Sequence, residues 1–234
     1  MLEHTGDPLG MKTVVREVAD FGEAPHAEGK PTPSGKLSQI VGLDLGQVSD
    51  YSAIAVVEMT EAVDPAKRNR RVKFHAVRQL RRWQLATAYT EIVEDVVALM
   101  AQLPGAVLVV DATGVGRAVV DLFKKANLPR LVPVTITGGD TVRHDADGWH
   151  LSKKQLVSVV QATLQTRRLK VAPALKEAKT LQRELSTFTV KVSLASATES
   201  FEAWRERDHD DLVLAVALAV WFTERGQSRF TFFC

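Results

Sequence analysis

Apolar and polar positions along the first half of the chain predict three neighbouring strands. Residues 40–46 form a nearly continuous apolar run, and residues 50–58 return as a second one after a tight turn. Residues 72–80 alternate between apolar and polar side chains, which is typical of a strand with one buried face. We therefore expect the ordered part of the chain to open with an antiparallel meander of three strands.

Helical spacing then alternates with short apolar runs. Residues 86–103 carry apolar side chains at helical spacing and are followed by Pro104 and Gly105, while residues 106–110 form a wholly apolar run. A strand, helix, strand, helix order favours a parallel section of sheet covered by helices. The further predicted elements are helices at 117–126, 152–166, 174–185 and 210–225, strands at 131–136 and 169–171, a loop at 140–149, and a hairpin pairing 188–194 with 200–204.

The two ends of the chain differ from its middle. Residues 1–37 are dense in Gly and Pro, which interrupt regular structure, and are expected to form a tail or linker. One folded domain over residues 38–226 and a C-terminal tail over residues 227–234 complete the predicted organisation. The fold class is α/β, with a mixed sheet in which an antiparallel meander joins parallel strands and helices lie on both faces.

Composition narrows the class of protein. The 234 residues are 45% hydrophobic and 25% charged, as in a globular domain, and the net charge of +2 does not by itself indicate a nucleic-acid partner. The one cysteine, Cys234, excludes an internal disulfide and a cysteine-based zinc site. The longest apolar run, residues 212–222, is too short to cross a membrane, and the N-terminal residues lack the continuous apolar segment that is typical of a signal peptide. We expect a cytoplasmic protein with no membrane partner.

Acidic residues occur at three comparable places. Asp44 lies within an apolar strand, Asp111 follows the run 106–110, and Asp210 and Asp211 begin the last helix. If these segments meet at one edge of the sheet, their carboxylates need a cation to remain ionised, and oxygen ligands suit Mg²⁺ or Mn²⁺. Two such ions would activate a water and stabilise the leaving oxygen in phosphodiester cleavage. The sequence leaves open whether one ion or two bind.

Each carboxylate also has an ordinary structural interpretation. Asp210 is a favoured N-cap for the last helix, and Asp111 is a common turn residue before Gly114. Asp44 is harder to explain in this way because Asp is disfavoured in the middle of a strand. His209 adjoins the acidic pair and is a candidate assisting residue. Which of Asp210 and Asp211 would be the ligand stays open.

Basic residues gather before and along the third strand and at the start of a later helix. Such clusters bind phosphate groups in a salt-dependent, sequence-independent way, although each also fits a solvated charged surface. The candidate DNA-binding residues are Arg68, Arg70, Arg71, Lys73, Arg81, Arg82, Lys153 and Lys154.

Three segments carry a family resemblance. Residues 41–46 with 50–53, residues 109–116 and residues 209–219 together resemble the nuclease domain of the phage terminase large subunit. The resemblance implies an RNase H-like fold over most of residues 38–226 and an endonuclease of little sequence specificity that cuts concatemeric phage DNA during packaging. It further implies that Asp44, Asp111 and Asp211 bind the metal, with Asp210 as an additional or alternative ligand.

The resemblance also implies partners. Double-stranded DNA would be the substrate, in the cytoplasm of a bacterial host. A full terminase large subunit begins with a packaging ATPase, and this sequence has no Walker A motif, so we expect an excised or separately encoded nuclease domain. The ATPase, a small terminase subunit and a portal would then be separate partners. The alternatives are a RuvC-type junction resolvase or other RNase H-like nuclease, and a non-catalytic packaging or scaffold module.

Overall fold

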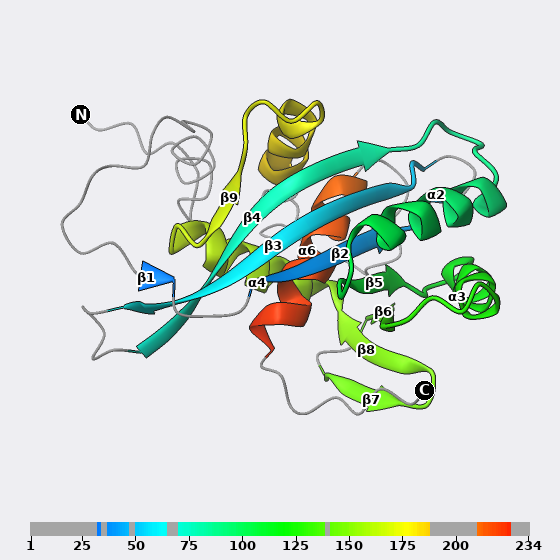
Figure 1. The fold of residues 1–234 in the computed structure, drawn as a ribbon, viewed down its shortest axis with the longest axis horizontal. Helices are drawn as coiled ribbons and strands as arrows, with labels where there is room; N and C mark the ends of the chain where they lie inside the picture. Colours follow the sequence, from blue (N-terminus) through cyan, green and yellow to red (C-terminus); the bar gives the residue numbers. More distant parts are fainter. Residues whose placement is uncertain are drawn as a thin grey trace.

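The computed structural model describes residues 32–33, 37–46, 50–64, 70–138, 141–187 and 210–225, and within them a single sheet runs through the molecule (Figure 1). Its strands lie in the order β7-β8-β6-β5-β2-β3-β4-β9, and β1 pairs with β3. The strands are β1 (Thr32–Pro33), β2 (Ser38–Asp44), β3 (Ala53–Asp64), β4 (Arg70–Arg82), β5 (Val107–Asp111), β6 (Leu131–Thr137), β7 (Arg143–Asp145), β8 (Gly148–Ser152) and β9 (Leu169–Val171). The helices are α2 (Tyr89–Gln102), α3 (Gly116–Lys125), α4 (Lys153–Gln165), an unlabelled helix over 178–187, and α6 (Asp211–Glu224).

The sheet is mixed, as the sequence predicts. Strands β2, β3 and β4 pair antiparallel, which confirms the opening meander. Strand β5 lies parallel to both β2 and β6, and β8 extends the parallel section beyond β6. This topology places the carboxyl ends of β2 and β5 side by side, because parallel neighbours end at the same edge.

The stretch 140–149 differs from its predicted loop. Residues from Arg143 onward form β7 and β8, an antiparallel hairpin at the sheet edge in which β8 also pairs parallel with β6. Gly148 has φ +123°, and a Cβ on it would meet the carbonyl oxygen of Pro133 at 2.4 Å, so this turn requires glycine. Polar composition suggested a loop, but Asp145 contacts the imidazole of His150 at 2.9 Å within the hairpin.

Several sequence predictions fall on residues outside the described ranges. They are the hairpin over 188–194 and 200–204, His209, Arg68 and the C-terminal tail, together with most of the N-terminal tail. Within that predicted N-terminal tail, β1 pairs with β3 through Thr32 and Val63. None of the helices in the described part of the chain is long and apolar enough to cross a membrane.

Helices cover both faces of the sheet (Figure 1). On one face α2 and α3 pack through residues such as Ile92, Val96 and Phe123. On the other face α4, helix 178–187 and α6 share a second core, which includes Leu156, Leu181 and the whole stretch 212–221. The described domain is therefore a three-layer α/β/α arrangement, with helices on both faces as predicted.

Helix α6 is buried along nearly all its length, because its sequence is apolar on every side. It packs directly on β2. A Cβ on Gly42 would lie only 1.9 Å from the carbonyl oxygen of Ala215, so only glycine permits this approach. The contact fixes the distance between the helix and the central strand.

The C-terminal end of α6 is held by β4 and by the residue preceding β9. The ammonium of Lys73 donates to the carbonyl oxygen of Thr223, satisfying a carbonyl in the last turn of the helix. The buried ring of His75 shares a hydrogen bond of 2.7 Å with the Thr223 hydroxyl, and Arg168 donates to Glu224 at 2.7 Å. Burial lowers the pKa of His75 to about 4, so its imidazole is neutral at pH 7.

Candidate acidic active site

Asp44 and Asp111 end neighbouring parallel strands. The register pairs Leu43 with Val110, so each aspartate is the next residue along its own strand. Side chains alternate between the faces of a sheet, and Leu43 and Val110 belong to the core beneath α2 and α3. Asp44 and Asp111 therefore project toward the opposite face, which α6 covers.

Helix α6 brings a third carboxylate to this edge. Asp211 precedes Ala215, the contact of Gly42, by one helical turn of about 5–6 Å, and Asp44 follows Gly42 by about 7 Å of strand. Helix α6 and strand β2 run in opposite directions (Figure 1), so both steps lead toward the same edge of the sheet. Asp211 is 4% exposed and Asp44 is 6% exposed, so both carboxyl groups are largely removed from water.

These carboxyl groups are costly to ionise. The pKa of Asp44 is raised well above its ordinary value, first by burial and then by the nearby charges of Asp111, Asp211 and Asp210, while the ammonium of Lys153 opposes the rise. The pKa of Asp211 is raised to about 7, again chiefly by burial, with repulsion from Asp210 and Asp50 next. A cation bound among them would remove this penalty.

Asp210 occupies the N-cap position of α6, but its side chain makes no capping hydrogen bond. Its carboxylate instead accepts a hydrogen bond of 2.5 Å from the ammonium of Lys153, the first residue of α4. The interpretation of Asp210 as a side-chain N-cap is therefore wrong in this structure. The ion pair links the starts of α4 and α6.

The capping role passes to Glu184, on helix 178–187. One of its carboxylate oxygens, Oε2, accepts hydrogen bonds from the backbone N–H groups of Leu212 at 3.0 Å and Val213 at 3.2 Å. The other, Oε1, lies 3.5 Å from the guanidinium of Arg82 at the end of β4. Burial, followed by repulsion from Asp211, raises the pKa of Glu184 to about 8.

The loop after β5 gives Asp111 a turn role as well. Its Oδ1 accepts a hydrogen bond of 2.8 Å from the backbone N–H of Thr113, as in an Asx turn. A Cβ on Gly116 would meet the Asp111 carbonyl oxygen at 2.0 Å, so α3 begins as close to Asp111 as glycine allows. The turn interpretation of Asp111 therefore holds in this structure, through its Oδ1 atom.

The turn after Asp44 is fastened from two sides. The backbone N–H of Gly46 donates to the hydroxyl of Ser52 at 3.1 Å, and the Tyr89 hydroxyl donates to the Gly46 carbonyl at 2.8 Å. These bonds tie the end of β2 to the start of β3 and to α2. They hold Asp44 on a rigid support, as a preorganised site requires.

The basic candidates take different positions. Lys153 and Arg82 lie at the acidic edge, bonded to Asp210 and Glu184. Lys73 is half-buried and fastens the end of α6 instead. The exposed candidates are Arg71, which pairs with Glu61 at 3.3 Å, Arg81, which pairs with Asp95 at 2.6 Å, and Lys154; Arg70 lies in β4, and Arg68 lies outside the described residues.

Sequence reasoning missed two acidic contributors. Asp50 was not among the candidate site residues, yet its charge helps to raise the pKa of Asp211. Glu184 had no signal in the sequence, because its partners Leu212 and Val213 lie 28 and 29 residues away and are backbone groups. Only the folded chain reveals that these groups belong to the same edge.

The donor set fits a hard divalent cation by its chemistry. Asp44, Asp111 and Asp211 supply oxygen ligands and repel one another, which is the charge balance that Mg²⁺ or Mn²⁺ corrects. As the side chains stand, however, no group of three or more His, Cys, Asp or Glu residues in the described ranges is arranged to hold a metal ion. Closing such a site requires side-chain movement toward the ion.

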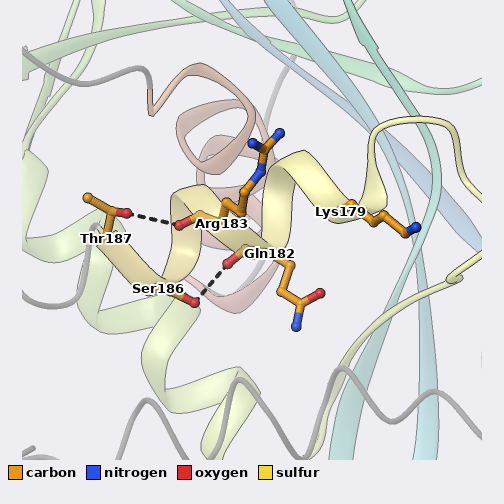
Figure 2. A pocket seen from close by; sticks show the side chains of 5 residues that line it. All are labelled: Lys179, Gln182, Arg183, Ser186 and Thr187. Atoms are coloured by element: carbon orange, nitrogen blue, oxygen red, sulfur yellow. Dashed lines mark hydrogen bonds between the residues drawn. The ribbon is translucent and has the colours of Figure 1, made fainter.

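A separate open hollow of about 700 Å³ lies along helix 178–187 (Figure 2). Lys179, Gln182, Arg183, Ser186 and Thr187 line it, and the two hydroxyls donate to backbone carbonyls one turn earlier in the helix. No carboxylate of the acidic edge lines this hollow. It is therefore distinct from the candidate site.

Comparisons with known proteins agree with the fold. The family model of the terminase RNaseH-like domain matches residues 41–221. Two crystal structures of the large terminase nuclease from thermophilic phage G20c are similar: one at 21% identity and TM-score 0.50, covering 79% of this chain and 81% of that one. The other, with bound zinc, has 19% identity and TM-score 0.52, and the match covers 88% of this chain and 96% of that one. No curated protein matches the chain.

Proposed function

The chain belongs to the terminase RNaseH-like domain family, and we propose that it is a divalent-metal-dependent DNA endonuclease, the cutting module of a viral DNA-packaging terminase. The observation that carries the proposal is the convergence of Asp44, Asp111 and Asp211 at one sheet edge, where burial and mutual repulsion call for a cation. The phage G20c nuclease with bound zinc, which shares this fold, supports divalent-ion binding here.

Asp44, Asp111 and Asp211 would hold Mg²⁺ or Mn²⁺, and two ions would suit the reaction. When bound, such ions supply an activated water and stabilise the departing oxygen of a phosphodiester. The protein's own contribution is positional: two strand ends and one helix start keep the carboxylates in place. Lys153 and Arg82 add positive charge beside them, which would attract a phosphate group.

The substrate proposed is double-stranded DNA, with little dependence on sequence. The exposed cations Arg71, Arg81 and Lys154 would contact phosphates, and such contacts position DNA without reading bases. A packaging ATPase, a small terminase subunit and a portal are the proposed assembly partners, in the cytoplasm of a bacterial host. Family membership favours this assignment over a RuvC-type junction resolvase.

The test is a nicking assay on supercoiled plasmid with Mn²⁺ or Mg²⁺, comparing the wild type with Asp44→Ala, Asp111→Ala and Asp211→Ala. We expect the wild type to nick and each variant to lose at least about 100-fold in rate, because each removes a metal ligand. Equal nicking by the wild type and Asp44→Ala would falsify the assignment. Preference for branched over linear DNA would instead support a resolvase.

One observation favours a second candidate, a non-catalytic packaging or scaffold module. In the described ranges the side chains form no ready metal site, and Lys153 already neutralises Asp210. Thermal melting with and without Mn²⁺ separates the two. If Mn²⁺ raises the melting temperature of the wild type but not that of Asp44→Asn, the nuclease is supported. If Mn²⁺ does not change the wild-type melting temperature, the scaffold module is supported.

A further inference from the structure

The start of helix α6 is capped by a side chain from outside the helix. The first N–H groups of a helix have no partner inside it, and an N-cap Asp normally accepts one or two of them. Here Asp210 holds the N-cap position, but its carboxylate is bonded to Lys153 at 2.5 Å and makes no capping bond. The acceptor comes instead from Glu184, 28 residues earlier in the chain.

Glu184 is placed to hold this end of the helix. Its side chain is 6% exposed, and Oε2 accepts from both Leu212 and Val213, the two residues after Asp211. Its other oxygen lies 3.5 Å from Arg82, whose guanidinium also stacks over the ring of Tyr51 at 4.5 Å. The start of α6 is therefore tied through Glu184 to the end of β4 and to the turn between β2 and β3.

We infer that Glu184 is a positioning residue of the proposed nuclease, which caps α6 in place of Asp210 and thereby sets where the Asp211 carboxylate lies relative to Asp44 and Asp111. The inference rests on the proposed function for its catalytic consequence. The capping itself rests on geometry alone. Because Glu184 accepts hydrogen bonds from the backbone N–H groups of Leu212 and Val213, the Asp211 carboxylate does not have to cap them and can face the edge where a cation would bind.

The position of Glu184 separates support from ligation. Both backbone bonds go to one oxygen, and the neighbouring cation lies at the other, so the carboxylate is engaged at both ends. Groups that orient metal ligands without touching the ion commonly change metal affinity 10–100-fold when removed. The amide oxygen of Glu184→Gln would still accept the hydrogen bonds from the two backbone N–H groups.

The test compares Glu184→Ala and Glu184→Gln with the matched control Glu177→Gln. Glu177 also lies near Arg82, at 4.0 Å, so its substitution removes a similar charge without touching α6. The first measurement is hydrogen exchange of the Leu212 and Val213 amides in the metal-free protein. We expect roughly tenfold faster exchange in Glu184→Ala, much less change in Glu184→Gln, and none in the control.

The second measurement is the Mn²⁺ concentration that gives half-maximal thermal stabilisation. The Mn²⁺ concentration for half-maximal nicking is measured in parallel, at a temperature well below the melting temperature of every variant. We expect Glu184→Ala to need roughly tenfold more Mn²⁺, and Glu184→Gln to stay within about threefold of the wild type. Unchanged Mn²⁺ dependence in Glu184→Ala overturns the inference, even if its melting temperature falls. Equal losses in the Ala and Gln variants also overturn it, because that pattern requires the charge rather than the acceptor.

These outcomes are distinguishable from failure of the proposed function. A wild type that neither nicks plasmid nor responds to Mn²⁺ defeats the nuclease proposal, and with it the catalytic consequence of Glu184. The exchange rates of the Leu212 and Val213 amides still decide whether Glu184 caps the helix. A wild type that nicks, beside a Glu184→Ala variant with wild-type Mn²⁺ dependence, defeats the positioning inference alone.

Discussion

The ammonium of Lys153 lies 2.5 Å from the carboxylate of Asp210 and joins the first residue of α4 to the residue before α6. Asp210 is thus already neutralised by a fixed cation, whereas Asp211 is buried beside other carboxylates. This difference separates two adjacent aspartates that the sequence treats alike. We therefore propose that Asp211, rather than Asp210, would bind the metal, because Asp210 is paired with Lys153.

The first prediction follows from that assignment. Asp211→Asn should reduce Mn²⁺-dependent plasmid nicking by at least about 100-fold, because it removes a ligand charge, whereas Asp210→Asn should reduce it by about tenfold or less. Single-turnover rates at saturating Mn²⁺ measure both. Lys153→Met is the companion variant: if Asp210 serves the lysine, it should lower activity about as much as Asp210→Asn. A larger loss in Asp210→Asn than in Asp211→Asn would reverse the roles.

The contact between Gly42 and Ala215 gives a second prediction. Gly42→Ala would place a Cβ 1.9 Å from the Ala215 carbonyl oxygen, so α6 must shift away from β2. We expect about 1–3 kcal/mol lower unfolding free energy and weaker stabilisation by Mn²⁺, measured by chemical denaturation and thermal melting. Gly138→Ala is the control, because nothing lies within 4 Å of its added Cβ. Wild-type stability in Gly42→Ala would contradict the close packing.

The third prediction concerns pH. Folding raises the pKa of Asp211 from 3.8 to about 7 and that of Glu184 from 4.5 to about 8, so the native state binds more protons than the unfolded state between these values. The stabilisation that the protonated Asp211 and Glu184 contribute to the folded state is fully present below about pH 4 and is lost as pH rises through 7 and 8.

The metal-free protein should therefore melt at a lower temperature at pH 9 than at pH 5. The corresponding decrease in unfolding free energy should be on the order of a few kcal/mol. Melting in EDTA across this range measures it, and Asp211→Asn should flatten the slope. Saturating Mn²⁺ should reverse the trend, because the ion binds the ionised carboxylates. A melting temperature that rises from pH 5 to pH 9 in EDTA would refute the electrostatic description of the site.

The fourth prediction separates two basic residues that the sequence groups together. Lys154 is exposed, so Lys154→Ala should weaken DNA binding, reduce the slope of log affinity against log salt by about one, and leave melting unchanged. Lys73 is bonded to the last turn of α6, so Lys73→Ala should lower the melting temperature. Fluorescence anisotropy with duplex DNA and thermal melting test the pair. Loss of DNA affinity in Lys73→Ala without any loss of stability would oppose this division.

Much of the fold could be predicted from local pattern. The apolar runs ending at Asp44 and Asp111 are strands, and the uniformly apolar stretch after Asp211 is a buried helix, because burial on all sides leaves no polar face. The order of elements also predicted the mixed sheet. The hairpin of β7 and β8 was missed, since its polar residues form pairs that composition alone does not reveal.

The site was less accessible to sequence reasoning than the fold. Strand ends and a helix start could be identified, and so could the aspartates on them. The cap supplied by Glu184 could not be identified, because it joins a side chain to backbone groups that carry no residue signature. The same holds for Lys153, which was grouped with DNA-binding residues although its ammonium bonds to Asp210.

Helix α6 is fastened at both ends, by Glu184 at its start and by Lys73, His75 and Arg168 at its finish. Its 14 residues span about 21 Å, and a close-packed helix transmits displacement along its axis more readily than it bends. We therefore expect a displacement at the C-terminal end of α6 to reach the acidic edge at its start. Substitutions at His75 should appear among variants with altered metal dependence, although that side chain touches no acidic ligand.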